Sequence, residues 1–204
     1  ARYHMAHLST AGAVRLMREA KRRGLPVTCE VTPHHLTLTE EACLNYDTST
    51  KVCPPLRGAK DVAALREALA DGTIDAIATD HAPHTSIEKF VEYDQAAFGM
   101  IGLETALALI LKLVDEGVLS RTAAIERLSP GPARAFGLPG GTIPEGSVAD
   151  ITCIDPAKEW TVNPNLFRSK SRNTPFAGWA MRGKAVVTIG AGKIIHDERG
   201  AQAP

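Results

Sequence analysis

An alternation of short apolar runs with amphipathic helical segments is the feature of this sequence that most constrains its fold. Residues 3–8, 27–31 and 74–79 have the composition of short strands. Between them, the spacing of apolar residues predicts helices over 11–23 and 59–70. Strands that alternate with helices at this spacing favour an α/β fold with a parallel sheet over a sandwich.

Polar groups follow the third apolar run abruptly. Asp80 comes directly after residues 74–79, and His81 and His84 follow it closely. In a (β/α) barrel the catalytic groups lie at the carboxyl ends of the strands, so Asp80 is a candidate catalytic residue. The alternative is that Asp80 only caps the turn before Pro83, a common position for Asp.

Histidines follow the first two predicted strands. His7 ends the first run, and His34 and His35 come shortly after the second. Imidazole and carboxylate are ligands that suit zinc or a similar divalent ion. A single histidine of this kind is more often a core or surface residue, but ligand types at successive strand ends favour a metal site. Spacing alone indicates a metal-dependent hydrolase and does not specify the reaction.

Charge and cysteine content narrow the classes of partner. The 23 Lys and Arg residues balance 23 Asp and Glu residues, so no basic surface for nucleic acid or anionic lipid is expected, and small molecules are the favoured partners. The four cysteines form no C-x-x-C pair, which favours a reduced, cytoplasmic chain over a disulfide framework. The longest apolar segment, 106–111, is too short to span a membrane.

The composition changes near residue 138. Before it, residues 85–102 show no sustained period and are interpreted as a lid or binding loop, and helices are predicted between 103 and 136. After it, short β-rich runs punctuated by Gly and Pro end in a hairpin predicted for 184–196. The sequence therefore predicts two domains, 1–138 and a small all-β segment at 139–204, which we expect to be part of a β-sandwich.

Six short motifs in a fixed order indicate a family. Together with a seventh at 169–176, they resemble bacterial-type (class I) dihydroorotases of the amidohydrolase superfamily over essentially the whole chain. Each motif is weak alone, but six in order are specific. They are Ala-His-Leu-Ser-Thr (6–10), Glu-Val-Thr-Pro-His-His-Leu (30–36), Pro-Pro-Leu-Arg (54–57), Asp-Gly-Thr-Ile-Asp (71–75), Ala-Thr-Asp-His-Ala-Pro-His (78–84) and Phe-Gly-Met-Ile-Gly-Leu-Glu-Thr (98–105).

The resemblance implies both a fold and an activity. The fold would be the C-terminal part of a (β/α)8 TIM-like metal-dependent hydrolase barrel, followed by a small all-β domain segment. The activity would be that of a cyclic amidohydrolase of pyrimidine biosynthesis, the reversible hydrolysis of dihydroorotate to N-carbamoyl-aspartate, with two Zn²⁺ ions in the complete site. A cytoplasmic homo-oligomer, or an association with aspartate transcarbamoylase, is also implied.

The resemblance also implies roles for the strand-end residues. His7 and His35 would bind one metal, while Asp80 would contact the other and act as general base and acid. A hydroxide held by the metal pair would attack a ring amide carbonyl, and Asp80 would take its proton and return it to the leaving nitrogen. His34 and His81 would be supporting residues.

Substrate contacts are implied at four positions. His84 would help to hold the substrate carboxylate, and the backbone near Ala97 and Phe98 would meet the pyrimidine ring. Cys53 stands where the family usually has an Asn that can hydrogen-bond the ring, and a Cys at this position is closer to allantoinases. Ala97 replaces the usual Pro, which we expect to loosen the lid.

The family's remaining ligands have no counterpart here. Its His-x-His pair, its carboxylate-binding Arg and Asn, and its bridging Asp or carboxylated Lys would precede residue 1, and no His-x-His occurs in the 204 residues. A typical barrel needs about 250 residues. We therefore expect this chain alone to be inactive or nearly so. Two alternatives stay open: another cyclic amidohydrolase such as an allantoinase or hydantoinase, and a non-catalytic dihydroorotase-like scaffold subunit.

Overall fold

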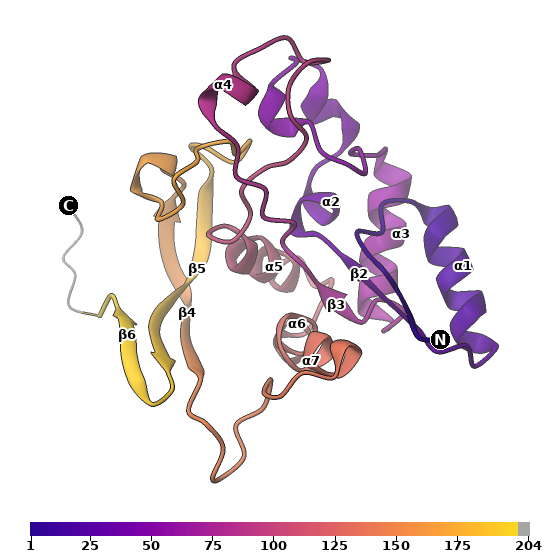
Figure 1. Cartoon of the computed structure of the whole chain (residues 1–204), viewed down its shortest axis with the longest axis vertical. Coiled ribbons are helices and arrows are strands. Elements are labelled where there is room, and N and C mark those ends of the chain that lie inside the picture. Colours follow the sequence, from indigo (N-terminus) through magenta and orange to yellow (C-terminus); the bar gives the residue numbers. More distant parts are fainter. Residues whose placement is uncertain (200–204) are drawn as a thin grey trace.

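A small parallel sheet forms the centre of the first half of the chain. In the computed structural model, which describes residues 1–199, strands β1 (Tyr3–Met5), β2 (Val27–Val31) and β3 (Ala76–Ile77) pair in parallel in the order β1-β2-β3 (Figure 1). The predicted parallel α/β architecture is confirmed. Strand β1 is shorter than predicted because His7, with φ 51°, has a left-handed backbone conformation that cannot continue a strand.

Two amphipathic helices cover this sheet and agree closely with the prediction. Helices α1 (Ala11–Arg22) and α3 (Ala59–Ala70) pack against each other. The Thr10 hydroxyl caps α1 by accepting a hydrogen bond from the Ala13 N–H at 3.1 Å. The core that they enclose with the sheet includes Val14, Cys29, Val31, Leu65, Leu69 and Ile74.

Two short helices are absent from the sequence-based prediction. Helix α2 (Pro33–Thr37) begins directly after β2, and the Thr32 hydroxyl caps it by accepting from the His35 N–H at 3.2 Å. Helix α4 (Ser86–Lys89) lies in the segment interpreted as a lid and starts with a capping box. Helices of five and four residues are too short to display a period in sequence. Two 3₁₀ turns also form, η1 (Glu40–Cys43) and η2 (Thr48–Thr50).

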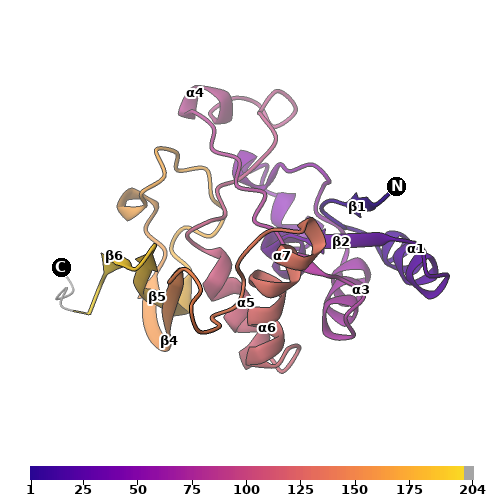
Figure 2. The ribbon, with the colours of Figure 1, turned by 60° about the horizontal axis from the view of Figure 1, so that its bottom comes forward.

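Helix α5 (Ala106–Asp115) has six buried residues and starts three residues later than predicted. It lies between the parallel sheet and a second sheet in both ribbon views (Figures 1 and 2). Helices α6 (Arg121–Leu128) and α7 (Pro130–Phe136) follow it and pack beside β3. Within residues 1–199, the structure contains no helix with both the length and the apolar character needed to cross a membrane.

The second sheet is antiparallel. Strands β4 (Ile151–Thr161), β5 (Ala180–Gly190) and β6 (Lys193–Asp197) pair in the order β4-β5-β6, so the predicted hairpin is confirmed. Strand β4 is longer than predicted because a register shift between Asp155 and Glu159 lets the strand pass Pro156 without a ladder hydrogen bond there. The domain boundary at 138 and the β-sandwich stay predictions, and residues 200–204 of the predicted segment lie outside the described residues.

A second core joins the two halves of the chain. Buried side chains from before α5 pack with residues from α5 and with residues around β4 and β5. The turn η3 (Pro164–Leu166) and the segment after it return from β4 towards the loops that follow β3 (Figure 1). Members of this core are Leu38, Val52, Met100, Leu109, Val162, Phe176 and Met181.

Candidate active site

His7 and Asp80 meet at the carboxyl ends of β1 and β3. The Nε2 atom of His7 lies 3.5 Å from Oδ1 of Asp80, and each side chain is about one quarter exposed, 26% and 27%. Both residues have positive φ, 51° and 48°, which is uncommon for residues with a Cβ and concentrates at functional sites. The sequence-based prediction that these two residues belong to one site therefore agrees with their geometry.

A buried carboxylate on β2 orients His7 and was missed by the sequence analysis. Glu30 Oε1 lies 3.0 Å from His7 Nδ1, and Glu30 Oε2 lies 3.2 Å from His4 Nε2. The Glu30 carboxylate therefore contacts both imidazole rings. The signal in the sequence was an acidic residue inside an apolar strand-like run.

These contacts shift the protonation of both partners. The interaction with Glu30 raises the pKa of His7 above its ordinary value, against the effect of burial, and the Asp80 charge adds to the rise. Burial alone would raise the pKa of Glu30, but the interactions with His7 and His4 outweigh it, so the pKa of Glu30 is lowered. The Glu30 carboxylate is therefore ionised and fixes the His7 ring.

His35 lies close enough to His7 and Asp80 for their charges to affect its pKa, but both of its ring nitrogens are in use. Its Nε2–H donates to the carbonyl oxygen of Pro54 at 2.9 Å, and its Nδ1 accepts from the Thr32 hydroxyl at 2.7 Å. Burial lowers the pKa of His35, so the ring is neutral. His34 packs against it with ring centroids 4.6 Å apart, and burial holds the pKa of His34 well below its ordinary value.

The fit of these residues to a divalent ion is partial. His7 and Asp80 fit, because a ligating imidazole commonly has its second ring nitrogen on a carboxylate, as Glu30 provides here. His35 would have to exchange its hydrogen bond to Pro54 for a metal. In the part of the chain that the structure describes, no group of three or more His, Cys, Asp or Glu side chains is arranged to hold a metal ion. The pairing of His7 with His35 on one metal stays a prediction.

The loop after β3 is held against residues 98–102. The Nδ1 atom of His81 accepts a hydrogen bond from the Gly102 N–H at 3.1 Å, and its supporting role stays a prediction. His84 Nε2–H donates to the Phe98 carbonyl oxygen at 2.9 Å. A Cβ on Gly99, which has φ +129°, would lie 2.4 Å from the Cβ of Ala82, so only glycine fits there.

A residue from the second half of the chain ties these loops together. Asn173, which is buried, donates from Nδ2 to the carbonyl oxygens of Ala82 at 3.0 Å and Gly99 at 3.1 Å. Its own carbonyl accepts from the Ile101 N–H at 3.0 Å. Asn173 was in a motif of the sequence analysis but had no predicted role.

The remaining predicted substrate contacts differ in their availability. Cys53 is exposed beside Pro54. Ala97 has both backbone groups engaged, its N–H with Glu88 O at 3.1 Å and its carbonyl with Lys89 Nζ at 2.7 Å. Among the described residues, the Phe98 N–H donates to no acceptor. Phe98 is thus the better placed of the two to contact a ligand through its amide.

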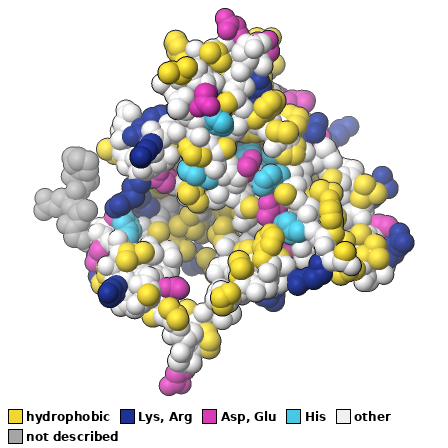
Figure 3. Space-filling view, viewed as in Figure 1, with side chains coloured by type: hydrophobic (Ala, Val, Ile, Leu, Met, Phe, Trp, Pro, Cys, Tyr) yellow, Lys and Arg dark blue, Asp and Glu magenta, His cyan; other side chains and the backbone are white. Residues whose placement is uncertain are grey.

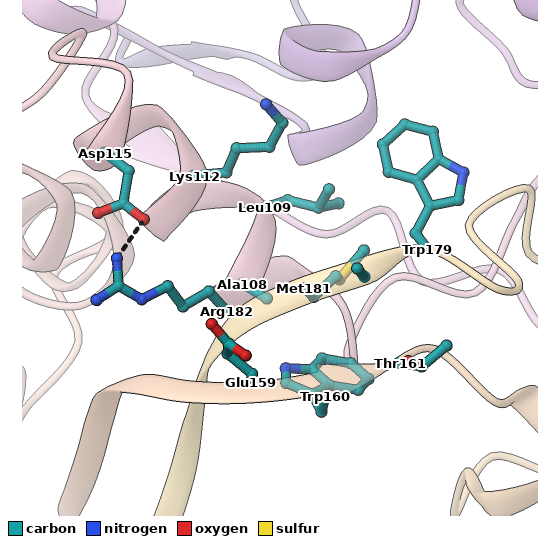
Figure 4. Close-up of a pocket in the computed structure, with 11 residues that line it drawn as sticks. Ala108, Leu109, Lys112, Asp115, Glu159, Trp160, Thr161, Trp179, Met181 and Arg182 are labelled. Atoms are coloured by element: carbon teal, nitrogen blue, oxygen red, sulfur yellow. Dashed lines mark ion pairs between the residues drawn. The ribbon is translucent and has the colours of Figure 1, made fainter.

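Histidine and acidic side chains gather on the surface near the site (Figure 3), and a mainly apolar cavity lies elsewhere. On the face shown in Figure 3, histidine and acidic side chains gather near the centre of the molecule. A cavity of about 640 Å³ lies between α5 and strands β4 and β5, and its lining includes Trp160, Trp179 and the ion pair of Asp115 with Arg182 (Figure 4). It contains none of the predicted site residues, so we do not assign it to the chemistry.

The comparison with protein families decides where the chain belongs. A model of the amidohydrolase family matches residues 1–195. The chain belongs to the amidohydrolase family. Within this family it is 58% identical over 199 residues to a dihydroorotase from Anaeromyxobacter sp. (strain K), a match over 97% of the chain and 46% of the relative. It is 59% identical over 199 residues to a dihydroorotase from Pelotomaculum thermopropionicum, over 97% of the chain and 47% of the relative.

Comparison with solved structures identifies the fold. The chain superimposes on an L-hydantoinase (dihydropyrimidinase) from Arthrobacter aurescens with a TM-score of 0.92 and 31% identity, over 99% of the chain and 46% of that enzyme. The expected amidohydrolase barrel fold and the resemblance to dihydroorotases are both confirmed. The chain spans about half the length of the curated relatives that it matches.

Proposed function

We propose that this chain carries the Asp80 side of a dihydroorotase active site. The observation that carries the proposal is the contact between His7 Nε2 and Asp80 Oδ1, in which two strand ends hold a ligand-type imidazole and a carboxylate 3.5 Å apart. The dihydroorotases to which the chain is more than half identical support dihydroorotate as the substrate. The reaction is the reversible opening of its cyclic amide to N-carbamoyl-aspartate.

The chemistry divides between a metal and the side chains. A divalent ion such as Zn²⁺, which His7 and Asp80 would help to hold, would supply a nucleophile from water at neutral pH and would polarise the amide carbonyl. Asp80 accepts a proton at its carboxylate and delivers it to the ring nitrogen that leaves, and its partial exposure leaves room for substrate. His7 would bind the ion through Nε2, because Glu30 contacts the Nδ1 edge of its ring.

The substrate ring is placed by the loops beyond β3. The free N–H of Phe98 is positioned to donate a hydrogen bond to a ring carbonyl, while His84 holds the Phe98 carbonyl from the other side. Binding of the substrate carboxylate by His84 requires its Nδ1 edge, which now lies 3.7 Å from Glu88. Cys53 offers only a weak hydrogen-bonding group to the ring.

Replacing Asp80 by Asn tests the proposal in the complete protein that carries this chain. We expect Asp80→Asn to lower kcat for dihydroorotate by about 100-fold or more, because the proton transfer loses its base. Glu145→Gln, which removes an exposed charge in the segment before β4, is the matched control and should leave kcat unchanged. Near-normal turnover by Asp80→Asn would exclude the base role.

A second cyclic amide is the alternative substrate. Cys53 in place of Asn and the similarity to an L-hydantoinase (dihydropyrimidinase) structure favour testing hydantoin and allantoin beside dihydroorotate. A kcat/KM for dihydroorotate that exceeds both others by at least about 100-fold would support our choice of substrate. The opposite order would assign the chain to another cyclic amidohydrolase.

The cysteines and the family resemblance bear on the cellular setting. All four cysteines are free, which favours a reducing compartment such as the cytoplasm. Homo-oligomer formation and association with aspartate transcarbamoylase stay predictions from the resemblance.

A further inference from the structure

Two lysines are buried beside the loop that would meet the substrate. Lys89 and Lys51 are only 7% and 9% exposed, although lysine is rarely buried unless it is paired. No carboxylate forms an ion pair with either one among residues 1–199. Both instead donate hydrogen bonds to backbone carbonyl oxygens. These hydrogen bonds, rather than ion pairs, satisfy the two buried ammonium groups.

Lys89 joins two segments that are far apart in sequence. Its Nζ donates to the Ala97 carbonyl oxygen at 2.7 Å and to the Thr48 carbonyl oxygen at 3.0 Å. In return, the Thr48 hydroxyl donates to the Lys89 carbonyl oxygen at 2.6 Å. The ammonium therefore fixes the carbonyl next to Phe98 relative to the η2 turn.

Lys51 completes the same attachment from the η2 side. Its Nζ donates to the Asp94 carbonyl oxygen at 2.7 Å and lies 4.5 Å from the centre of the Phe98 ring. Its own carbonyl accepts from the Gly99 N–H at 2.8 Å. The residues before and after Phe98, Ala97 and Gly99, are thus each hydrogen-bonded to one of the two lysines. The Phe98 N–H itself has no hydrogen-bond acceptor among the described residues.

We propose that Lys89 is a positioning residue for substrate binding, which sets the backbone at Ala97 and Phe98 so that the Phe98 N–H faces the substrate ring. The inference rests on the proposed function, because it takes the ring of dihydroorotate as the group bound there. Lys89 does not touch the reacting atoms. It acts through the carbonyl that it holds, with the η2 turn as its second attachment point.

Lys89→Met is the direct test, since Met keeps the length and apolar stem of the side chain and removes all three donors. In the complete protein that carries this chain, we expect KM for dihydroorotate to rise about 10-fold or more with kcat changed less than about 3-fold, the pattern of lost uniform binding. Lys60→Met, at an exposed position on α3, is the matched control and should leave both constants unchanged.

A measurement without substrate separates this inference from the proposed function. In hydrogen exchange of the same variants, amides of residues 86–98 should exchange about 10-fold faster in Lys89→Met, with those of α3 unchanged. If wild-type protein does not hydrolyse dihydroorotate, the proposed function fails, and the exchange result still decides whether Lys89 holds the loop.

Two outcomes would overturn the inference. One is a fall in kcat with KM unchanged, which would mean that Lys89 only maintains the amount of folded enzyme. The other is unchanged exchange of residues 86–98. Should Lys89→Met fail to fold, Thr48→Val removes the reciprocal hydrogen bond alone, and it should raise KM in the same direction by a smaller factor. An unchanged KM in Thr48→Val would then count against the proposal.

Discussion

At the scale of single residues, the site is made by backbone conformations and contacts that composition does not encode. His7 and Asp80 both adopt a left-handed conformation that costs about 1–2 kcal/mol for a residue with a Cβ. Hydrogen bonds of neighbouring residues hold both in place: the Leu8 N–H donates to the Glu30 carbonyl oxygen at 2.9 Å, and the Ala82 N–H donates to the Met100 carbonyl oxygen at 3.0 Å. The backbone next to His7 and Asp80 is therefore as restricted in conformation as these two residues themselves.

Removing the charge of Glu30 should weaken metal binding. In the complete protein, we expect Glu30→Gln to raise the dissociation constant for Zn²⁺ by about 10–100-fold, because His7 loses the carboxylate that fixes its ring. Zinc content after dialysis against graded chelator concentrations measures the effect. Glu145→Gln serves as control, and equal zinc retention by the two variants would show that Glu30 does not orient a ligand.

A methyl group on Gly99 should displace the loop. We expect Gly99→Ala to lower the free energy of unfolding by about 2–4 kcal/mol, from backbone strain and the clash with Ala82. Gly146→Ala is the matched control, since Gly146 also has positive φ but has open space around its Cβ position, and it should cost only about 1 kcal/mol. Urea unfolding of both variants gives the comparison. Equal losses would mean that the clash is relieved by movement of the loop.

At the scale of elements, the site depends on pieces of chain too short to be recognised by period. Helix α3 was predicted correctly because its apolar face repeats over twelve residues. Helix α2 was missed because five residues show no repeat, although it positions His34 and His35. The role of Glu30 was missed because a single acid in an apolar run gives no indication of which side chains it faces. Contacts between distant segments, such as Lys89 with Thr48, follow only from the tertiary structure.

The attachment of the loop should depend on pH through Lys89. Burial lowers the pKa of Lys89 to about 8 from 10.5, with Lys51 adding to the fall and Asp47 and Glu88 opposing it. With residues 86–98 attached as in this structure, Lys89 binds its proton less tightly than it would with this loop detached. Attachment of the loop therefore becomes more favourable as the pH rises from about 8 towards 10.5. The neutral amine keeps two hydrogens for the carbonyls of Thr48 and Ala97.

Hydrogen exchange between pH 7.5 and 9.5 checks this sign. After correction for intrinsic rates, protection of residues 86–98 should increase with pH in the wild-type protein, and Lys89→Met should show no such increase. Protection that falls with pH would mean that the charged form holds the loop more strongly than the neutral form.

At the scale of the whole molecule, the two halves of the chain share one interior. Helix α5 packs against β5, and the second core combines residues from both sides of the predicted boundary at 138. The order of strands and helices was predictable, because the apolar pattern of each element lies within one short stretch of the sequence. The packing of the antiparallel sheet on α5 was not predictable, nor was the return of its connecting segment to the site. No local sequence pattern indicates which surfaces contact each other.

The hydrogen bonds of Asn173 carry a consequence for how the protein is made. Ala82, beside Asp80, and its partner Asn173 are separated by 91 residues, so during synthesis from the N-terminus the site loops leave the ribosome long before the side chain that joins them. At typical elongation rates the delay is roughly 5–18 s. The loops around Asp80 in a nascent chain lack their Asn173 hydrogen bonds for that time, and a ribosome that stalls before residue 173 leaves them without these bonds.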